Sequence, residues 1–125
     1  MSIPKNSQNL ELDKKAAIHG LTDVEYEQKR AEYTANCLEA DGTWTGGKIY
    51  LLTFGLKFVP HNFIQIAQPF GLLWTEIQAV HFSNRLFILR TGLDLELKDS
   101  LKKVRFITFH RVKIKSFIEA KISRN

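Results

Sequence analysis

The sequence has a single cysteine, Cys37, and only three prolines among its 125 residues. One cysteine excludes an internal disulfide, and a lone thiol fits a reducing compartment. The first nine residues contain no apolar stretch, so we expect no secretory signal. No run approaches the roughly 20 apolar residues that span a bilayer, and we expect no transmembrane segment. These absences predict a soluble, cytoplasmic protein, with peripheral attachment at a membrane surface as the alternative.

Patterns that carry catalysis or bind metals are also missing. The histidines are isolated, and no His-x-x-x-His or Cys-x-x-Cys spacing offers tetrahedral metal ligands. No nucleophile stands beside a base in the sequence, and Gly46-Gly47 lacks both the spacing and the following helix of a phosphate-binding loop. We therefore expect no enzyme activity, no metal site and no cofactor.

The net charge is unevenly distributed along the chain. Residues 1–43 carry a net charge of −3, whereas residues 84–125 carry +7, and the whole chain carries +5. Such an asymmetry concerns binding partners rather than the fold. The basic half predicts an acidic partner: lipid headgroups, nucleic acid or another protein.

Residues 1–34 are expected to form an extension made of a flexible tail and a helical hairpin. A first short helix ends at Gly20, where a helix C-terminus favours glycine. Thr22 and Glu25 have the spacing of a capping box, which predicts a second helix over 23–34. The segment from Ile18 to Ala31 resembles the SHOCT motif of bacterial proteins, and the alternative is a generic capped helical hairpin.

From residue 35 to residue 125 the pattern is that of short antiparallel strands followed by one helix. A β-hairpin over Gly46–Pro60 is the clearest element, because two apolar, β-branched and aromatic runs flank a turn. The other predicted strands are Cys37–Ala40, Phe63–Ile66, Leu72–Phe82, Leu86–Arg90, Leu93–Lys98 and Lys103–Phe109. The spacing of Ile114, Phe117, Ile118 and Ile122 predicts an amphipathic C-terminal helix. We expect a mainly β domain, an antiparallel β-barrel closed by that helix.

Alternation along two of these strands predicts which side chains they bury. In Leu72–Phe82, Ile77, Ala79 and His81 are expected on one face and Gln78, Val80 and Phe82 on the other. In Leu93–Lys98, Asp94 and Glu96 alternate with leucines and are expected to face water.

The order of these segments resembles the GRAM domain, a pleckstrin-homology-like barrel, over residues 35–123. The resemblance is carried by Gly47–Thr53, by the apolar strand Leu56–Pro60 and by Leu73–Val80. Where the family often has Asn-Arg-Arg or Asn-Arg-Lys after the threonine, this chain has Phe54-Gly55. The resemblance implies a pleckstrin-homology-like fold and a non-catalytic binding module.

The function follows from charge and from this resemblance. We expect a basic barrel rim to recognise an acidic surface such as anionic lipid headgroups. The candidate ligand-binding residues are Lys98, Lys102, Lys103, Arg105, Arg111 and Lys113, and the candidate interaction residues are Phe54, Phe70 and Trp74. One alternative is a module that binds a protein partner or forms a homo-oligomer. A further alternative, placed after these two, is nucleic-acid binding by the basic, Phe-rich strand, with Phe106 and Phe109 stacking on bases.

Overall fold

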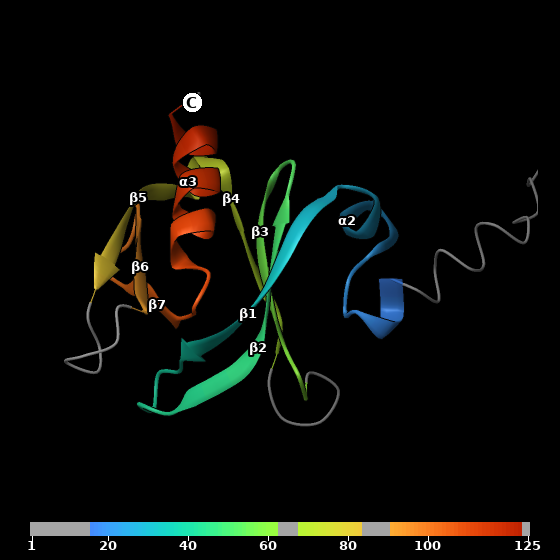
Figure 1. Cartoon of the computed structure of the whole chain (residues 1–125), viewed down its shortest axis with the longest axis horizontal. Helices are drawn as coiled ribbons and strands as arrows, with labels where there is room; N and C mark the ends of the chain where they lie inside the picture. The colour runs from blue at the N-terminus through green and yellow to red at the C-terminus, as the bar shows by residue number, and fades with distance from the viewer. Residues whose placement is uncertain (1–15, 63–67, 84–90, 124–125) are drawn as a thin grey trace, which may run out of the picture.

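The structure is a computed structural model of the whole chain, and it describes residues 16–62, 68–83 and 91–123 (Figure 1). Within these ranges a seven-stranded antiparallel sheet is combined with short helices. The elements are α2 (Asp23–Glu27), β1 (Lys29–Leu38), β2 (Trp44–Leu52), β3 (Gly55–Pro60), β4 (Phe70–Leu73), the 3₁₀ turn η1 (Trp74–Glu76), β5 (Ile77–Ser83), β6 (Gly92–Leu97), β7 (Lys103–Ile107) and α3 (Arg111–Ile122). The strands expected at 63–66 and 86–90 lie outside the described residues.

The sheet has the strand order β4-β3-β2-β1-β7-β6-β5, so β4 and β5 are its outer strands. No ladder joins β4 to β5 in the described part of the chain. Instead η1 connects them, held by the Trp74 N–H donating to the Phe54 carbonyl (3.3 Å) and by the Lys98 N–H donating to the Glu76 carbonyl (3.0 Å). Helix α3 packs against β5, β6 and η1 (Figure 1). The predicted mainly β architecture with a covering C-terminal helix is therefore confirmed.

The main core lies between the inner face of the sheet and α3. Ile114 and Ile118 of the helix are fully buried, and Phe117 and Ile122 pack beside them, so the predicted helix and its apolar face are confirmed. Burying side chains of this size contributes about 1.5 to 3 kcal/mol each, which makes this contact the main reason that α3 stays on the sheet. The other fully buried residues of this main core lie on strands and are Ile49, Leu51, Leu56, Phe58, Ile77, Leu93, Leu95 and Phe106.

A second apolar cluster covers the outer face of the β2–β3 hairpin. Tyr50, Leu52 and Val59 point away from the main core and are buried by Ala16 and Leu21 of the N-terminal segment. Strand β2 is consequently buried on both faces from Ile49 to Leu52, which explains why its sequence is continuously apolar rather than alternating.

The predicted Gly46–Pro60 hairpin is present as β2 and β3. The two strands pair from Gly47 opposite Pro60 to Leu51 opposite Leu56, and they turn at Thr53 and Phe54. Glycine is required at position 47 because a Cβ there would lie 2.4 Å from the Val59 carbonyl oxygen. The backbones of the two strands therefore approach each other more closely at this position than a side chain permits.

The helix expected over 23–34 is wrong beyond Glu27. Its start is confirmed, because the Thr22 hydroxyl accepts from the Glu25 N–H (3.2 Å) and the Glu25 carboxylate accepts from the Thr22 N–H (2.8 Å). The chain then enters β1 at Lys29, so residue 35, the expected domain boundary, lies inside a strand. Pairing of β1 with β2 over nearly its whole length outweighs the local helix propensity of Lys29–Glu32. The first strand also ends earlier than expected, at Leu38, and Ala40 lies in a turn.

The expected faces of β5 are wrong because the strand contains a β-bulge. The register against β6 shifts between Ile77 and Ala79. A bulge inserts one extra residue, so positions on either side of it exchange faces. Ile77 and Val80 are therefore both buried, whereas His81 is exposed.

We expect acid to weaken the attachment of α2 to the sheet. Burial alone raises the pKa of Glu25, but hydrogen bonds from Lys57 and Thr22 outweigh it, and the pKa is lowered from its usual 4.5. A lowered pKa stabilises the fold above the usual value, and this stability is lost as the pH falls through the pKa of the folded protein. Because the Lys57 Nζ–Glu25 Oε1 bond (2.7 Å) is largely shielded from water, Glu25→Gln should cost about 1 to 2 kcal/mol near pH 7.

Urea unfolding of the wild type and of Glu25→Gln at about pH 7 and about pH 3 measures this effect. The difference between the two proteins should shrink at the lower pH. The matched control is Glu27→Gln, an exposed glutamate on the same helix. A difference that is equal at both pH values would contradict the assignment to the Glu25 charge.

Candidate functional site

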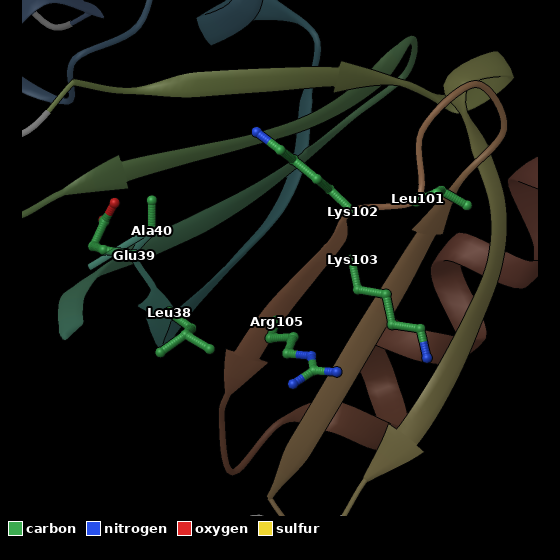
Figure 2. A pocket seen from close by; sticks show the side chains of 7 residues that line it. All are labelled: Leu38, Glu39, Ala40, Leu101, Lys102, Lys103 and Arg105. Carbon is green, nitrogen blue, oxygen red and sulfur yellow. The ribbon is translucent and has the colours of Figure 1, made fainter. Parts of the chain in front are cut away.

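A groove opens between the ends of two hairpins (Figure 2). Strands β1 and β7 pair only at Asn36 opposite Ile107 and at Cys37 opposite Phe106, and from there toward Leu38 and Arg105 they diverge (Figure 2). The divergence leaves a groove of about 570 Å³ between the β1–β2 turn and the β6–β7 turn. It is lined by Leu38, Glu39, Ala40, Leu101, Lys102, Lys103 and Arg105.

Three of the predicted ligand-binding residues, Lys102, Lys103 and Arg105, line this groove. Lys103 and Arg105 share a face of β7, as alternate residues of a strand do, whereas Lys102 extends away from them over the groove (Figure 2). Lys103 lies 3.8 Å from Glu96 and Arg105 lies 3.8 Å from Asp94. Lys102 forms no ion pair in the part of the chain that the structure describes. It is therefore the cation of the groove most available to a ligand.

Lys98 lies in the same β6–β7 turn, exposed and without an ion pair among the described residues. It does not line the groove, but it stands at the other end of the turn that carries Lys102. We call Lys98, Lys102, Lys103 and Arg105 the basic rim. Lys113 is exposed on α3 and outside the groove, so the structure does not bring it to the rim.

Arg111 is not a surface cation. Its guanidinium is buried at the start of α3, where Nη1 donates to the carbonyl oxygens of Ser83 (3.2 Å) and Gly92 (3.3 Å). It also stacks over the Phe82 ring at 4.4 Å. These contacts fasten α3 to the ends of β5 and β6, which gives Arg111 a structural role in place of the expected ligand contact.

Asp94 is buried, contrary to the expectation that it faces water. The Ser83 hydroxyl donates to its Oδ1 at 3.2 Å, and Arg105 lies near its other oxygen. Glu96, two residues on, is only partly buried and lies between Lys103 and His81. The alternation of β6 is therefore preserved, but the outer face is covered at Asp94.

The three candidate interaction residues have different environments. Phe54 is exposed at the β2–β3 turn, as expected. Phe70 packs on the core, 5.8 Å from the Phe58 ring. Trp74 is buried: its Nε1 donates to the Thr53 carbonyl (3.1 Å), and its ring lies 5.9 Å from that of Phe117. Of these three, only Phe54 is exposed, whereas Phe70 is partly buried.

The nucleic-acid alternative loses one of its two stacking residues. Phe106 is fully buried in the main core, 5.6 Å from Phe58, so it cannot stack on a base. Phe109 is exposed, but it follows the end of β7 and does not line the groove.

Sequence reasoning missed Leu38, Glu39, Ala40 and Leu101 as parts of the site. Glu39 brings a carboxylate into a groove whose other charged residues are all cationic. Burial, assisted by the charge of Glu39, raises the pKa of the neighbouring Cys37 to about 12, so this thiol is not a nucleophile near neutral pH. A signal for Leu101 was present, because an apolar residue between Ser100 and two lysines is out of place in a polar turn.

In the described ranges, no three acidic, histidine or cysteine side chains are grouped so that they could hold a metal ion. His19 stacks on Tyr26 at 5.7 Å and contacts Tyr50, which assigns it to the second apolar cluster. No helix within the same ranges has the length and apolar character needed to cross a membrane.

Comparison with protein-family models finds no match, and comparison with curated proteins finds no relative. Solved structures do share the fold. The C-terminal domain of an unknown protein from Leishmania infantum has a TM-score of 0.66 at 12% identity, covering 94% of this chain and 99% of that one. The N-terminal PH (pleckstrin-homology) domain of Vps36 has a TM-score of 0.58 at 16% identity, covering 77% and 79%. Inner Membrane Complex Sub-compartment Protein 3 from Toxoplasma gondii has a TM-score of 0.56 at 15% identity, covering 98% of this chain and 90% of that one.

These similarities concern the fold. The seven-stranded antiparallel sheet with its C-terminal helix has a PH-like fold. At such low identity the similarity concerns the fold alone, and function has to be argued from the groove and its charges.

Proposed function

We propose that this protein is a non-catalytic binding module that recognises an anionic lipid surface through the basic rim. The observation that carries the proposal is the groove between β1 and β7, an open depression that Lys102, Lys103 and Arg105 line. The PH-like fold supports a binding role, and the GRAM resemblance over residues 35–123 is part of the proposal.

The charges of the rim are sufficient for reversible attachment. A lysine or arginine close to an anionic leaflet contributes about 1 kcal/mol, and the attraction falls off within the Debye length. Lys98 and Lys102 have no ion pair among the described residues, so each would contribute the full attraction to the anionic leaflet. Lys103 and Arg105 already face carboxylates at 3.8 Å and contribute less. Four such groups provide weak, salt-sensitive binding rather than permanent anchoring, so the protein would be peripheral at the membrane.

A protein partner, or a second copy of the chain, is the second candidate. Phe54 and Leu73 are both exposed and line one hollow beside η1, at the end of the outer strand β4. Neighbouring exposed apolar side chains are typical of protein contacts. This surface is formed by the β2–β3 turn and β4, and none of its residues lines the groove.

Co-sedimentation with vesicles tests the proposal. We expect the wild-type chain to bind phosphatidylcholine–phosphatidylserine vesicles at low salt and to bind them more weakly near physiological salt. It should not bind vesicles of pure phosphatidylcholine. Equal binding to both vesicle types would contradict recognition of an acidic surface. Absence of binding at either salt would overturn the lipid proposal and favour a protein partner, for which sedimentation velocity of the chain alone is the next measurement.

A further inference from the structure

A leucine stands at the outer end of the basic rim. Leu101, in the β6–β7 turn, is fully exposed, the most exposed of the large apolar side chains that the structure describes. Leucine is usually buried, although a single exposed leucine is common on protein surfaces. Leu101 differs because it shares the groove with two further aliphatic side chains, Leu38 and Ala40, and stands directly before Lys102.

The turn that carries Leu101 is anchored by hydrogen bonds on both sides. The Lys102 N–H donates to the Ser100 hydroxyl at 3.0 Å. At the other end, the Lys98 N–H donates to the Glu76 carbonyl at 3.0 Å. The fold therefore projects Leu101 into solvent, with Ser100 before it and Lys102 and Lys103 after it. Exposing an apolar side chain to water is unfavourable, and this position becomes favourable only when the side chain meets an apolar medium.

We infer that Leu101 inserts into the boundary between headgroups and acyl chains of an anionic bilayer while the rim contacts the phosphates. The inference rests on the proposed function and narrows it: the ligand is a bilayer surface rather than a soluble anion. The cations supply the salt-sensitive attraction, and Leu101 adds an apolar component that salt does not screen. Lys102, the next residue, suits this position, because a lysine can lay its aliphatic stem in the interface and keep its ammonium group in water.

Leu101→Ser separates the two components. We expect it to weaken binding to phosphatidylcholine–phosphatidylserine vesicles about tenfold, which corresponds to about 1.4 kcal/mol. Binding of inositol hexakisphosphate, a soluble polyanion, should be unchanged. The matched control is Val24→Ser, which removes an aliphatic side chain that is 61% exposed on α2, between Asp23 and Glu25. This control should bind both probes as the wild type does.

A fluorescent reporter gives an independent readout. An environment-sensitive label on Leu101→Cys should brighten and shift to shorter wavelength with anionic vesicles, and the same label on Val24→Cys should not. The native thiol does not interfere, because Cys37 is buried and its pKa is raised to about 12.

The outcomes distinguish this inference from the proposed function. If the wild type binds anionic vesicles, Leu101→Ser binds them equally well and the fluorescence of the label is unchanged, the insertion of Leu101 is contradicted. Recognition of the anionic surface by the basic rim is then still supported. A parallel loss of vesicle and inositol hexakisphosphate binding would also overturn it, because Leu101 would then act on the groove itself. If the wild type does not bind anionic vesicles, both proposals fail.

Discussion

Binding to anionic vesicles is expected to fall about a hundredfold or more when Lys102 and Lys103 are both changed to glutamate. Each lysine near an anionic surface contributes about 1 kcal/mol, and each charge reversal replaces an attraction with a repulsion, so a loss of about 3 to 4 kcal/mol follows. Lys102 carries most of the effect because it has no ion pair among the described residues, whereas Lys103 faces Glu96. Vesicle co-sedimentation at low salt measures the loss.

Two comparisons locate the effect in the groove. Lys113→Glu with Lys121→Glu changes the net charge by the same amount on α3, away from the groove, and should cost much less. Glu39→Gln removes the carboxylate that lines the groove and should strengthen binding severalfold. Equal losses for the two double variants would show that net charge, and not the rim, is recognised.

The folding of the charge-reversal variant needs its own check. Lys103 pairs directly with Glu96 across β6 and β7, so a glutamate at position 103 faces a like charge. Lys102→Glu with Lys103→Gln avoids this repulsion. It should retain most of the binding defect and the wild-type thermal unfolding midpoint.

Gly47→Ala is expected to lower the free energy of unfolding by about 3 kcal/mol or more, the upper end of what overpacking costs. An added Cβ would lie 2.4 Å from the Val59 carbonyl oxygen and 2.8 Å from both Pro60 Cα and Phe58 Cζ. Two of these three atoms belong to the backbone of β3, which is fixed by its pairing with β2 and β4. The hairpin therefore has to separate to accommodate the methyl group. Urea denaturation of the purified variant measures the change.

Gly71→Ala is the matched control on the outer strand β4. The atom nearest to its added Cβ is the Leu56 carbonyl oxygen at 3.6 Å, an ordinary contact. Alanine also restricts the unfolded chain, so we expect a change within about 1 kcal/mol, toward greater stability. A similar loss for both variants would assign the cost to backbone freedom and not to the close approach at Gly47.

The sequence was most informative where local patterns and tertiary contacts agree. The hairpin at Gly46–Pro60 and the apolar face of α3 were predictable because strand and helix periodicity matched the burial that the fold requires. The capping box at Thr22 was predictable because it involves only neighbouring residues.

Errors arose where contacts distant in sequence decide the structure. Lys29–Glu32 favours a helix locally, and only its pairing with β2 makes it a strand. The bulge in β5 is an irregularity of pairing with β6, and alternation within one strand does not reveal it. Both errors therefore concern partners that periodicity does not identify.

The sequence predicted one wall of the candidate site but not the other, because only one wall is formed by residues that are close together in the sequence. Its cations are close together in the sequence, and the charge asymmetry identified them. Its other wall, Leu38 to Ala40, lies far away in the sequence and reaches the cations only because the sheet places β1 beside β7. The burial of Arg111 and Trp74 depends likewise on carbonyl groups of distant strands and turns.

The two buried faces of β2 bear on how the hairpin keeps its register. A register slip of one residue normally moves the apolar side chains of a strand from the core face to the solvent face, so the hydrophobic pattern prevents it. In β2 both faces are apolar from Ile49 to Leu52, and a slipped strand would still bury apolar side chains on each side. Lys48 supplies the missing penalty: a slip in one direction moves it into the place of Gly47, where no side chain fits, and a slip in the other moves it into the fully buried place of Ile49. One lysine and one glycine thus specify an alignment that hydrophobicity leaves undetermined.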